Sequence, residues 1–148
     1  AALRAIRLAG AKGDITSQKA VVWSRDKNTP YTPSPLLHGG LLYFLQSNNA
    51  LLSCVDAKSG KEHYARTRLR DVGTVYASLV GARDRVYVVG KGGMTTVVAH
   101  GSSFAVLAEN ELDDQFSATP ALSGDAIYLR GHRYLYCVAA VSDPGELR

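Results

Sequence analysis

The chain has 148 residues, of which 46% are hydrophobic and 20% are charged, a composition typical of a folded globular protein and not of a disordered one. Its 17 basic and 13 acidic residues give a formal net charge of +4 and are scattered without a long run. That pattern lacks the concentrated charge of a nucleic-acid-binding surface. No stretch reaches the roughly 18 apolar residues of a membrane-spanning helix. We therefore expect no nucleic-acid partner and no membrane span.

The first 28 residues contain two short segments rich in Ala, Leu, Ile and Val, from Leu3 to Leu8 and from Ala20 to Ser24. Short apolar runs separated by turn residues are typical of β-strands. The two segments resemble the third and fourth strands of the unit that follows them, and nothing before them corresponds to a first and a second strand. We therefore interpret residues 1–28 as a partial blade.

A complete four-stranded unit is predicted in residues 29–72. Its strands run from Pro35 to His38, Leu41 to Gln46, Leu51 to Asp56 and Glu62 to Arg66. Between them, Gly39-Gly40 and Asn48-Asn49 supply the positive φ angles that tight hairpin turns need. The unit is therefore predicted to be one antiparallel sheet with short connections.

Three arginines near the end of this unit, Arg66, Arg68 and Arg70, alternate with other residues. Alternation with a period of two is typical of one face of a β-strand. The pattern favours a solvent-exposed face over a polyanion site.

A recurring tyrosine indicates that the unit is an internal repeat. Each of three tyrosines follows a small hydroxyl residue by nine positions, in the pairs Ser34 and Tyr43, Ser78 and Tyr87, and Thr119 and Tyr128. Successive tyrosines lie 44 and 41 positions apart, a period typical of propeller blades. Gly92-Gly93 in the second repeat occupies the place of Asn48-Asn49 in the first. Residues 73–113 are therefore predicted to form a second blade.

Residues 114–148 repeat only part of the unit. Three strands are predicted, from Ala121 to Ser123, Ala126 to Arg130 and Tyr134 to Ala139. A fourth is not expected, because Pro144 and Gly145 discourage continuation as a strand. The fold class is thus all-β, with four-stranded antiparallel blades of a β-propeller, about two full and two partial. Because rings need about four to eight blades, we expect a fragment of a larger propeller or a homo-oligomer that completes one.

The two cysteines occupy matching places in different repeats. Cys54 lies in LLSCV of the first blade and Cys137 in YLYCV of the third. Residues two periods apart in a radial array are too distant for the short Cα separation of a disulfide. We therefore expect both to be buried, unpaired core thiols.

The segment from Val55 to Tyr64 resembles the repeat signature of pyrrolo-quinoline quinone (PQQ) type propellers, in which Asp, Thr-Gly and Trp occupy the places of Asp56, Ser59-Gly60 and Tyr64. Trp23 precedes Tyr64 by one period of 41, and in the second blade His100 takes the place of the Asp. The resemblance implies a bacterial, extracytoplasmic protein. Known members include quinoprotein alcohol dehydrogenases and many noncatalytic propellers, so fold alone does not define the chemistry.

Seven residues are interpreted as structural markers of the repeat. The aromatic ones are expected to pack between or within blades, where large rings bury most area, and Asp56 to accept backbone hydrogen bonds in its turn. The seven residues are Trp23, Tyr43, Asp56, Gly60, Tyr64, Tyr87 and Tyr128.

Catalytic and metal sites are not expected. A quinoprotein dehydrogenase would show adjacent cysteines, calcium ligands and a general-base Asp, and none is recognisable. The doublet Asp113-Asp114 is interpreted as a turn. The histidines, at positions 38, 63, 100 and 132, lack the short spacing of a ligand set. We predict no catalytic residue, no metal and no cofactor. PQQ would be a cofactor only if the chain is a piece of a PQQ-dependent dehydrogenase.

Partner contact is predicted in the segments that lead into each first strand, because loops at one face of a propeller carry function. These segments contain Tyr31-Thr32, Val75-Tyr76 and Phe116-Ser117, and a compact basic hairpin contains Arg130, His132 and Arg133. The candidate contact residues are Tyr31, Thr32, Tyr76, Phe116, Arg130 and His132. We expect a noncatalytic module for protein or ligand binding or scaffolding. The alternatives are a piece of a PQQ-dependent dehydrogenase and an assembly unit that completes a propeller by oligomerisation.

Overall fold

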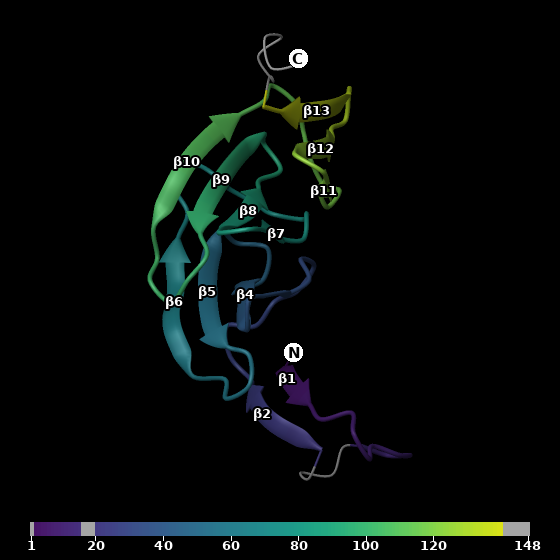
Figure 1. Cartoon of the computed structure of the whole chain (residues 1–148). Coiled ribbons are helices and arrows are strands. Elements are labelled where there is room, and N and C mark those ends of the chain that lie inside the picture. The colour runs from purple at the N-terminus through teal and green to yellow at the C-terminus, as the bar shows by residue number, and fades with distance from the viewer. Residues whose placement is uncertain (1, 16–19, 141–148) are drawn as a thin grey trace, which may run out of the picture.

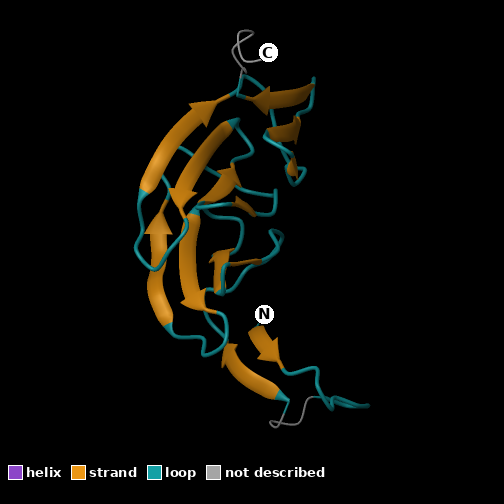
Figure 2. Ribbon diagram, viewed as in Figure 1, coloured by secondary structure: helices purple, strands orange, loops and turns teal. Residues whose placement is uncertain are grey.

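The computed structural model describes residues 2–15 and 20–140, and all regular elements in these ranges are β-strands (Figures 1 and 2). The predicted all-β fold class is confirmed. No helix that could cross a membrane occurs in the described ranges. The segment of residues 141–148, with its expected strand-breaking Pro and Gly, lies outside them.

In the described part of the chain, thirteen strands form four antiparallel sheets in chain order. The N-terminal sheet pairs β1 (Leu3–Ile6) with β2 (Val21–Arg25). The first blade contains β3 (Leu36–His38), β4 (Leu41–Leu45), β5 (Leu51–Asp56) and β6 (Glu62–Arg68). The second contains β7 (Val80–Ala82), β8 (Arg85–Val89), β9 (Met94–Ala99) and β10 (Val106–Glu111). The third contains β11 (Ala121–Ser123), β12 (Ala126–Arg130) and β13 (Leu135–Ala139).

The sheets follow one another along an arc, with β6 and β10 on its convex outer side (Figure 1). Within each sheet, consecutive strands pair with each other, so the hydrogen-bond order is the sequence order. Apolar side chains of adjacent blades meet between the sheets. One buried cluster joins the first and second blades and includes Tyr43, Leu52 and Val88, and a smaller one joins the second and third blades around Phe116 and Leu129.

The turn chemistry differs from the sequence prediction at one hairpin. Gly39 and Gly40 do adopt positive φ angles of 53° and 80°. In the β4–β5 hairpin, however, Ser47 takes the positive φ, 51°, and not the Asn48-Asn49 pair. The reason is that Ser47 is held from outside the hairpin, since its amide donates to the carbonyl of Thr29 at 3.0 Å.

The outer strand β6 is longer than the predicted Glu62 to Arg66. It continues to Arg68 because a bulge at Arg66, with φ of 52°, lets the strand regain its register with β5. The amide of Arg66 donates to the hydroxyl of Ser53 at 3.0 Å, so the bulge leaves no unpaired donor there.

Candidate functional site

One end of the blades is built from two kinds of loop that hydrogen-bond to each other. Lead-in segments 29–33, 74–76 and 115–117 run between hairpin loops 46–50, 90–93 and 131–134. For example, the amide of Val75 donates to the carbonyl of Asn48 at 2.9 Å, and that of Phe116 to the carbonyl of Lys91 at 3.0 Å. We call these six segments together the loop face. The blades hold its backbone in place, so its side chains project from a fixed frame.

Three tyrosines are exposed on the loop face. Tyr31 is 80% exposed, Tyr134 61% and Tyr76 37%. Lys91 places its ammonium 5.6 Å from the centre of the Tyr76 ring, within the range of a cation–π contact. Thr32 is exposed beside Tyr31, and its amide donates to Asn48 Oδ1 at 3.3 Å. Exposed tyrosines near cationic groups are typical of surfaces that bind proteins.

Phe116, another expected contact residue, is buried. Its side chain is 1% exposed and packs against the ring of Tyr136, with ring centres 5.7 Å apart. It belongs to the apolar cluster between the second and third blades. Its side chain therefore does not reach the surface, and the repeat pattern could not show this because, of the two residues at the matching place, Val75 is buried whereas Tyr31 is 80% exposed.

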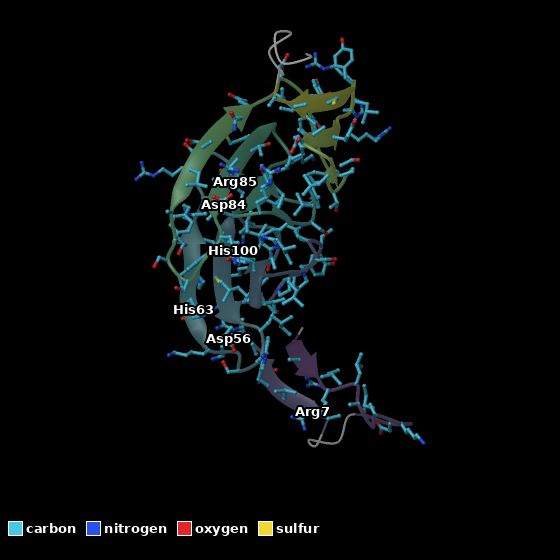
Figure 3. All side chains as sticks on the ribbon, in the orientation of Figure 1. Arg7, Asp56, His63, Asp84, Arg85 and His100 are labelled. Atoms are coloured by element: carbon cyan, nitrogen blue, oxygen red, sulfur yellow. The ribbon has the colours of Figure 1, made fainter. Side chains whose placement is uncertain are left out.

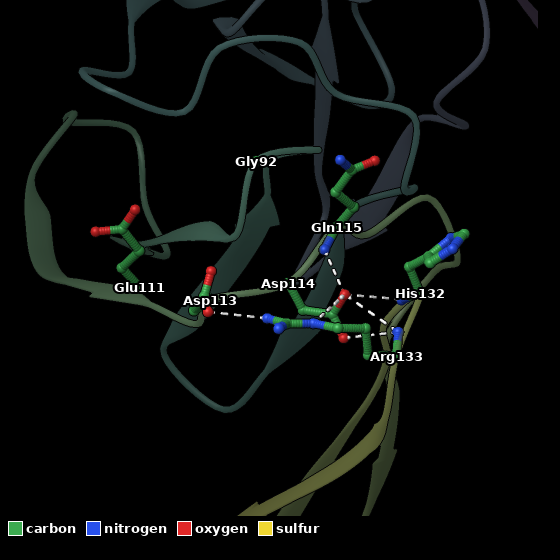
Figure 4. A pocket seen from close by; sticks show the side chains of 7 residues that line it. All are labelled: Gly92, Glu111, Asp113, Asp114, Gln115, His132 and Arg133. Carbon is green, nitrogen blue, oxygen red and sulfur yellow. Dashed lines mark hydrogen bonds and ion pairs between the residues drawn. The ribbon is translucent and has the colours of Figure 1, made fainter.

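A hollow of about 810 Å³ opens on the loop face between the second and third blades (Figure 4). Its lining residues are Gly92, Glu111, Asp113, Asp114, Gln115, His132 and Arg133. The lining is polar, and its carboxylates outnumber its one guanidinium. The sequence prediction missed this hollow, because the residues come from three separate segments of the chain.

Asp114 is the buried centre of this region, with its side chain only 2% exposed. Its two oxygens accept hydrogen bonds from five donors in the lead-in segment and the third blade, with lengths of 2.7 to 3.2 Å. The donors are the amides of Gln115, His132, Arg133 and Tyr134 and the hydroxyl of Tyr136. Burial opposes the charge, but these hydrogen bonds outweigh it and lower the pKa of Asp114 to about 2.

The carboxylate of Asp114 thus holds the β12–β13 hairpin against the preceding connection. Gly131 is the hairpin residue that lets it approach, because any side chain there would collide with the Asp114 oxygens. The Asp113-Asp114 doublet therefore does more than start a turn: Asp114 links two blades. The sequence signal for this contact was a glycine in the β12–β13 hairpin, Gly131, together with an Asp in the connection before that blade, Asp114.

The predicted basic hairpin already has an acidic partner within the chain. Arg133 pairs with Asp113 at 3.0 Å and lies 3.8 Å from Asp114 (Figure 4). Its guanidinium also lies 5.8 Å from the centre of the Tyr134 ring. Arg130 and His132 are exposed nearby. These two remain candidates for partner contact, whereas Arg133 serves the hairpin itself.

The repeated hydroxyl residues form a chain of hydrogen bonds from blade to blade. The amide of Ser34 donates to the hydroxyl of Ser78 at 3.0 Å. The amide of Ser78 in turn donates to the hydroxyl of Thr119 at 3.1 Å. The nine-residue spacing identified these residues, and the structure assigns them a shared task, which is to tie the first strands of neighbouring blades together.

Aromatic markers of the repeat lie at junctions between sheets. Trp23 Nε1 donates to the carbonyl of Ala57 at 3.0 Å, and its ring covers Gly60, where a side chain would collide with it. One blade further on, the ring of Tyr64 meets that of Phe104 edge to face, with centres 5.6 Å apart. Both rings therefore bridge adjacent sheets.

Asp56 holds the turn between β5 and β6. Its Oδ1 accepts the amide and the hydroxyl of Ser59 at 2.7 and 2.6 Å. These bonds lower the pKa of the Asp56 carboxyl. By strand register Ala99, and not His100, occupies the matching place in the second blade, since Asp56 pairs with Leu41 and Ala99 with Arg85. The assignment of His100 to the Asp place was wrong by one residue.

His100, labelled in Figure 3, instead joins a polar cluster between the first and second blades. Its Nδ1 lies 2.8 Å from the hydroxyl of Tyr43, which also accepts the amide of Gly101 at 2.9 Å. The ring of His38 lies 4.7 Å from that of His100, and its Nε2 donates to the carbonyl of Arg83 at 2.8 Å. Burial raises the pKa of Tyr43 to about 12. The repeat pattern does not indicate this pairing, because the two histidines belong to different blades.

Tyrosine exposure rises along the arc. Tyr43 is fully buried, Tyr87 is half-buried and Tyr128 is 37% exposed. Cysteine exposure rises in the same direction. Both cysteines are free thiols, but Cys54 is buried whereas Cys137 is exposed. The expectation that both are buried was wrong for Cys137, because no sheet among the described residues covers that face of the third blade.

The described residues contain no group of three or more His, Cys, Asp or Glu side chains that could hold a metal ion. The two histidines at the first blade junction are each engaged by protein groups. Both oxygens of Asp114, the buried carboxylate beside the hollow, accept hydrogen bonds from protein donors. With both oxygens hydrogen-bonded, the Asp114 carboxylate is suited neither to binding a cation nor to transferring a proton.

No protein-family model matches the chain, and no curated protein matches it. Among solved structures, the chain is similar to BamB from Moraxella catarrhalis, with a TM-score of 0.58 and 13% sequence identity over 81% of this chain. The match covers 36% of the BamB chain, so this protein spans about a third of that structure. At this identity the likeness concerns the fold, and it supports the β-propeller architecture.

Proposed function

We propose that the chain is a noncatalytic β-propeller module that binds a protein partner through its loop face. The observation that carries the proposal is the exposure of Tyr31, Tyr76 and Tyr134 on loops that the blades hold in place. Tyrosine has a large ring and few rotatable bonds, so it gives much contact area at small entropic cost. The likeness to BamB supports the propeller architecture that carries this face, and the PQQ-type repeat pattern favours an extracytoplasmic setting.

Rigidity of the loop face supports this function. Hairpin loop 90–93 is bonded to lead-in segments on both sides: the amide of Lys91 donates to the carbonyl of Thr74 at 2.8 Å, and the carbonyl of Lys91 accepts the amide of Phe116. A frame that is already ordered loses little freedom on binding, which favours affinity. The module is therefore suited to scaffolding.

Site-specific crosslinking tests the proposal. A photoreactive amino acid at position 31 or 76 should capture one partner of defined mass in cells of the source organism. The same group at Leu37, which is 64% exposed on β3, is the matched control. Excess unlabelled chain should suppress the crosslink, and excess Tyr31→Ala/Tyr76→Ala chain should not. Equal capture from position 37, or equal competition by the variant, would contradict the proposal.

The dehydrogenase alternative is tested separately. Titration of the chain with PQQ and calcium should give no saturable spectral change if the module is noncatalytic. Stoichiometric, saturable binding would favour the quinoprotein instead.

A second candidate, an assembly unit that completes a propeller with other copies, is favoured by the face of the third blade that no described sheet covers. Leu135 is 71% exposed and Val138 48%. Contact there would be apolar and therefore insensitive to salt. Sedimentation at high salt is the test: a monodisperse monomer at every concentration excludes this role.

A further inference from the structure

The outer strands of the first two blades carry opposite charges at matching positions. Leu52 pairs with Thr67 in the first blade, and its counterpart Thr95 pairs with Asn110 in the second. This register places the basic row of Arg66, Arg68 and Arg70 at the positions that the acidic row of Glu109, Glu111 and Asp113 occupies one blade later. All six residues are exposed.

Four of these six charged side chains have no hydrogen-bond or ion-pair partner within the described part of the chain. Arg66 is engaged by Gln46, whose Oε1 accepts its Nε at 2.9 Å, and Asp113 by Arg133. By contrast, Arg68 and Arg70 form no ion pair with a described residue. The same holds for Glu109 and Glu111. Each row thus has two unpaired charges of one sign, next to a third residue that already has a hydrogen-bond or ion-pair partner in its own chain.

Both rows begin on strands at free sheet edges, and each ends two residues beyond its strand, at Arg70 and Asp113. Among the described residues β6 pairs only with β5 and β10 only with β9, and both strands lie on the convex side of the arc (Figure 1). Like charges repel β6 from a second β6 and β10 from a second β10. Charge is a common means of blocking unwanted contacts at sheet edges. The one combination left attractive is β6 of one copy with β10 of another.

We propose that this rim is a self-association surface, on which two copies of the chain meet about a twofold axis. The axis reverses the rows, so Arg68 faces Glu111 of the other copy and Arg70 faces Glu109. Arg66 and Asp113, which already have partners within their own chain, then face each other. A twofold contact forms every pair twice. All four free charges of each copy are therefore matched, and the second copy is the partner whose complementary chemistry this chain contains.

The association is weak and depends on salt. Exposed ion pairs are individually weak, and their attraction is screened over about 10 Å at 0.1 M salt but over about 3 Å at 1 M. We expect the association constant to fall at least about tenfold across that range. This response separates the rim from the apolar face of the third blade.

Charge reversal tests the proposal on the full chain. Arg68→Glu/Arg70→Glu gives a copy with two acidic rows, and Glu109→Arg/Glu111→Arg gives a copy with two basic rows. Sedimentation velocity at low salt should show self-association of the wild type at least about tenfold stronger than that of either variant. An equimolar mixture of the two variants should associate again, because acidic rows then meet basic rows.

Lys58→Glu/Lys61→Glu, on the exposed β5–β6 turn, makes the same charge change as the first variant away from the rim and should leave association unchanged. Circular dichroism melting curves check that each variant is folded. The combined fourfold reversal, which exchanges the two rows, should associate like the wild type. A wild type that stays monomeric at low salt, or a variant mixture that fails to associate, would overturn the proposal.

Discussion

The hydroxyl chain between blades can be tested by removing one of its members. Ser78→Ala deletes the oxygen that accepts the amide of Ser34 and leaves the next bond, from the amide at position 78 to Thr119, in place. An intramolecular hydrogen bond contributes about 0.5–1.5 kcal/mol net. Ser34 is exposed, so water partly replaces the lost acceptor. We therefore expect a loss of about 0.5–1 kcal/mol in the free energy of unfolding.

The same reasoning distinguishes the three positions. Thr119→Ala should cost a similar amount, because it frees the amide of Ser78. Ser34→Ala should change stability by less than about 0.5 kcal/mol, because its own hydroxyl makes no hydrogen bond with the described residues and the site is exposed. The double variant of Ser78 and Thr119 should be additive, since each substitution breaks a different bond.

Urea unfolding followed by far-ultraviolet circular dichroism is the assay, with thermal melting as a second measure. For a chain of this size, about 0.5–1 kcal/mol corresponds to a Tm shift of about 1–4 °C. The interpretation fails if Ser34→Ala destabilises the chain as much as Ser78→Ala. In that case the effect would be one of local conformation and not of contact between blades.

Three further outcomes are expected. Hydrogen bonds hold the pKa of Asp114 at about 2, so its stabilising effect is complete above the ordinary carboxyl pKa of about 4 and is lost as the pH falls toward 2; urea titrations at stepped pH should show that Asp114→Asn has a shallower pH dependence in that window. Tyr43→Phe should cost about 1–2 kcal/mol because it strands a half-buried amide, whereas Tyr128→Phe, at an exposed ring, should cost less than about 0.5; equal shifts of their denaturation curves would refute this. Burial raises the pKa of Cys54 to about 11, so at pH 8 an alkylating reagent should label Cys137 first, as peptide mass mapping will show.

Local sequence was sufficient for the strands and their order. The strand predicted from Leu51 to Asp56 and those from Ala121 to Ser123 and Ala126 to Arg130 have the same bounds in the structure. These elements depend on neighbouring residues, since hairpin turns and apolar runs act over a few positions. The repeat period then placed equivalent residues in equivalent sheets.

Most polar contacts between blades were out of reach of such reasoning, although the packing of Trp23 and Tyr64 between sheets was expected. The pairing of His38 with His100 and the five-donor site of Asp114 bring together segments that a repeat pattern treats as copies, not as neighbours. Phe116 shows the same limit, because the pattern reports its place in the blade and not which side of the sheet is covered. Side-chain function here depends on how much of each blade its neighbour conceals.

The row of Ser34, Ser78 and Thr119 has a direction. Every amide in it donates toward the C-terminal neighbour, so the row ends in unlike groups: a hydroxyl oxygen at Ser34 and, at Thr119, an amide hydrogen that has no acceptor among the described residues. Two such rows can be joined front to back, with the amide of one meeting the hydroxyl of the other. Front-to-front contact would bring like groups together. Any sheet that extends the arc beside the third blade must therefore arrive in one orientation, and its first strand must carry a hydrogen-bond acceptor at the place that the tyrosine spacing marks.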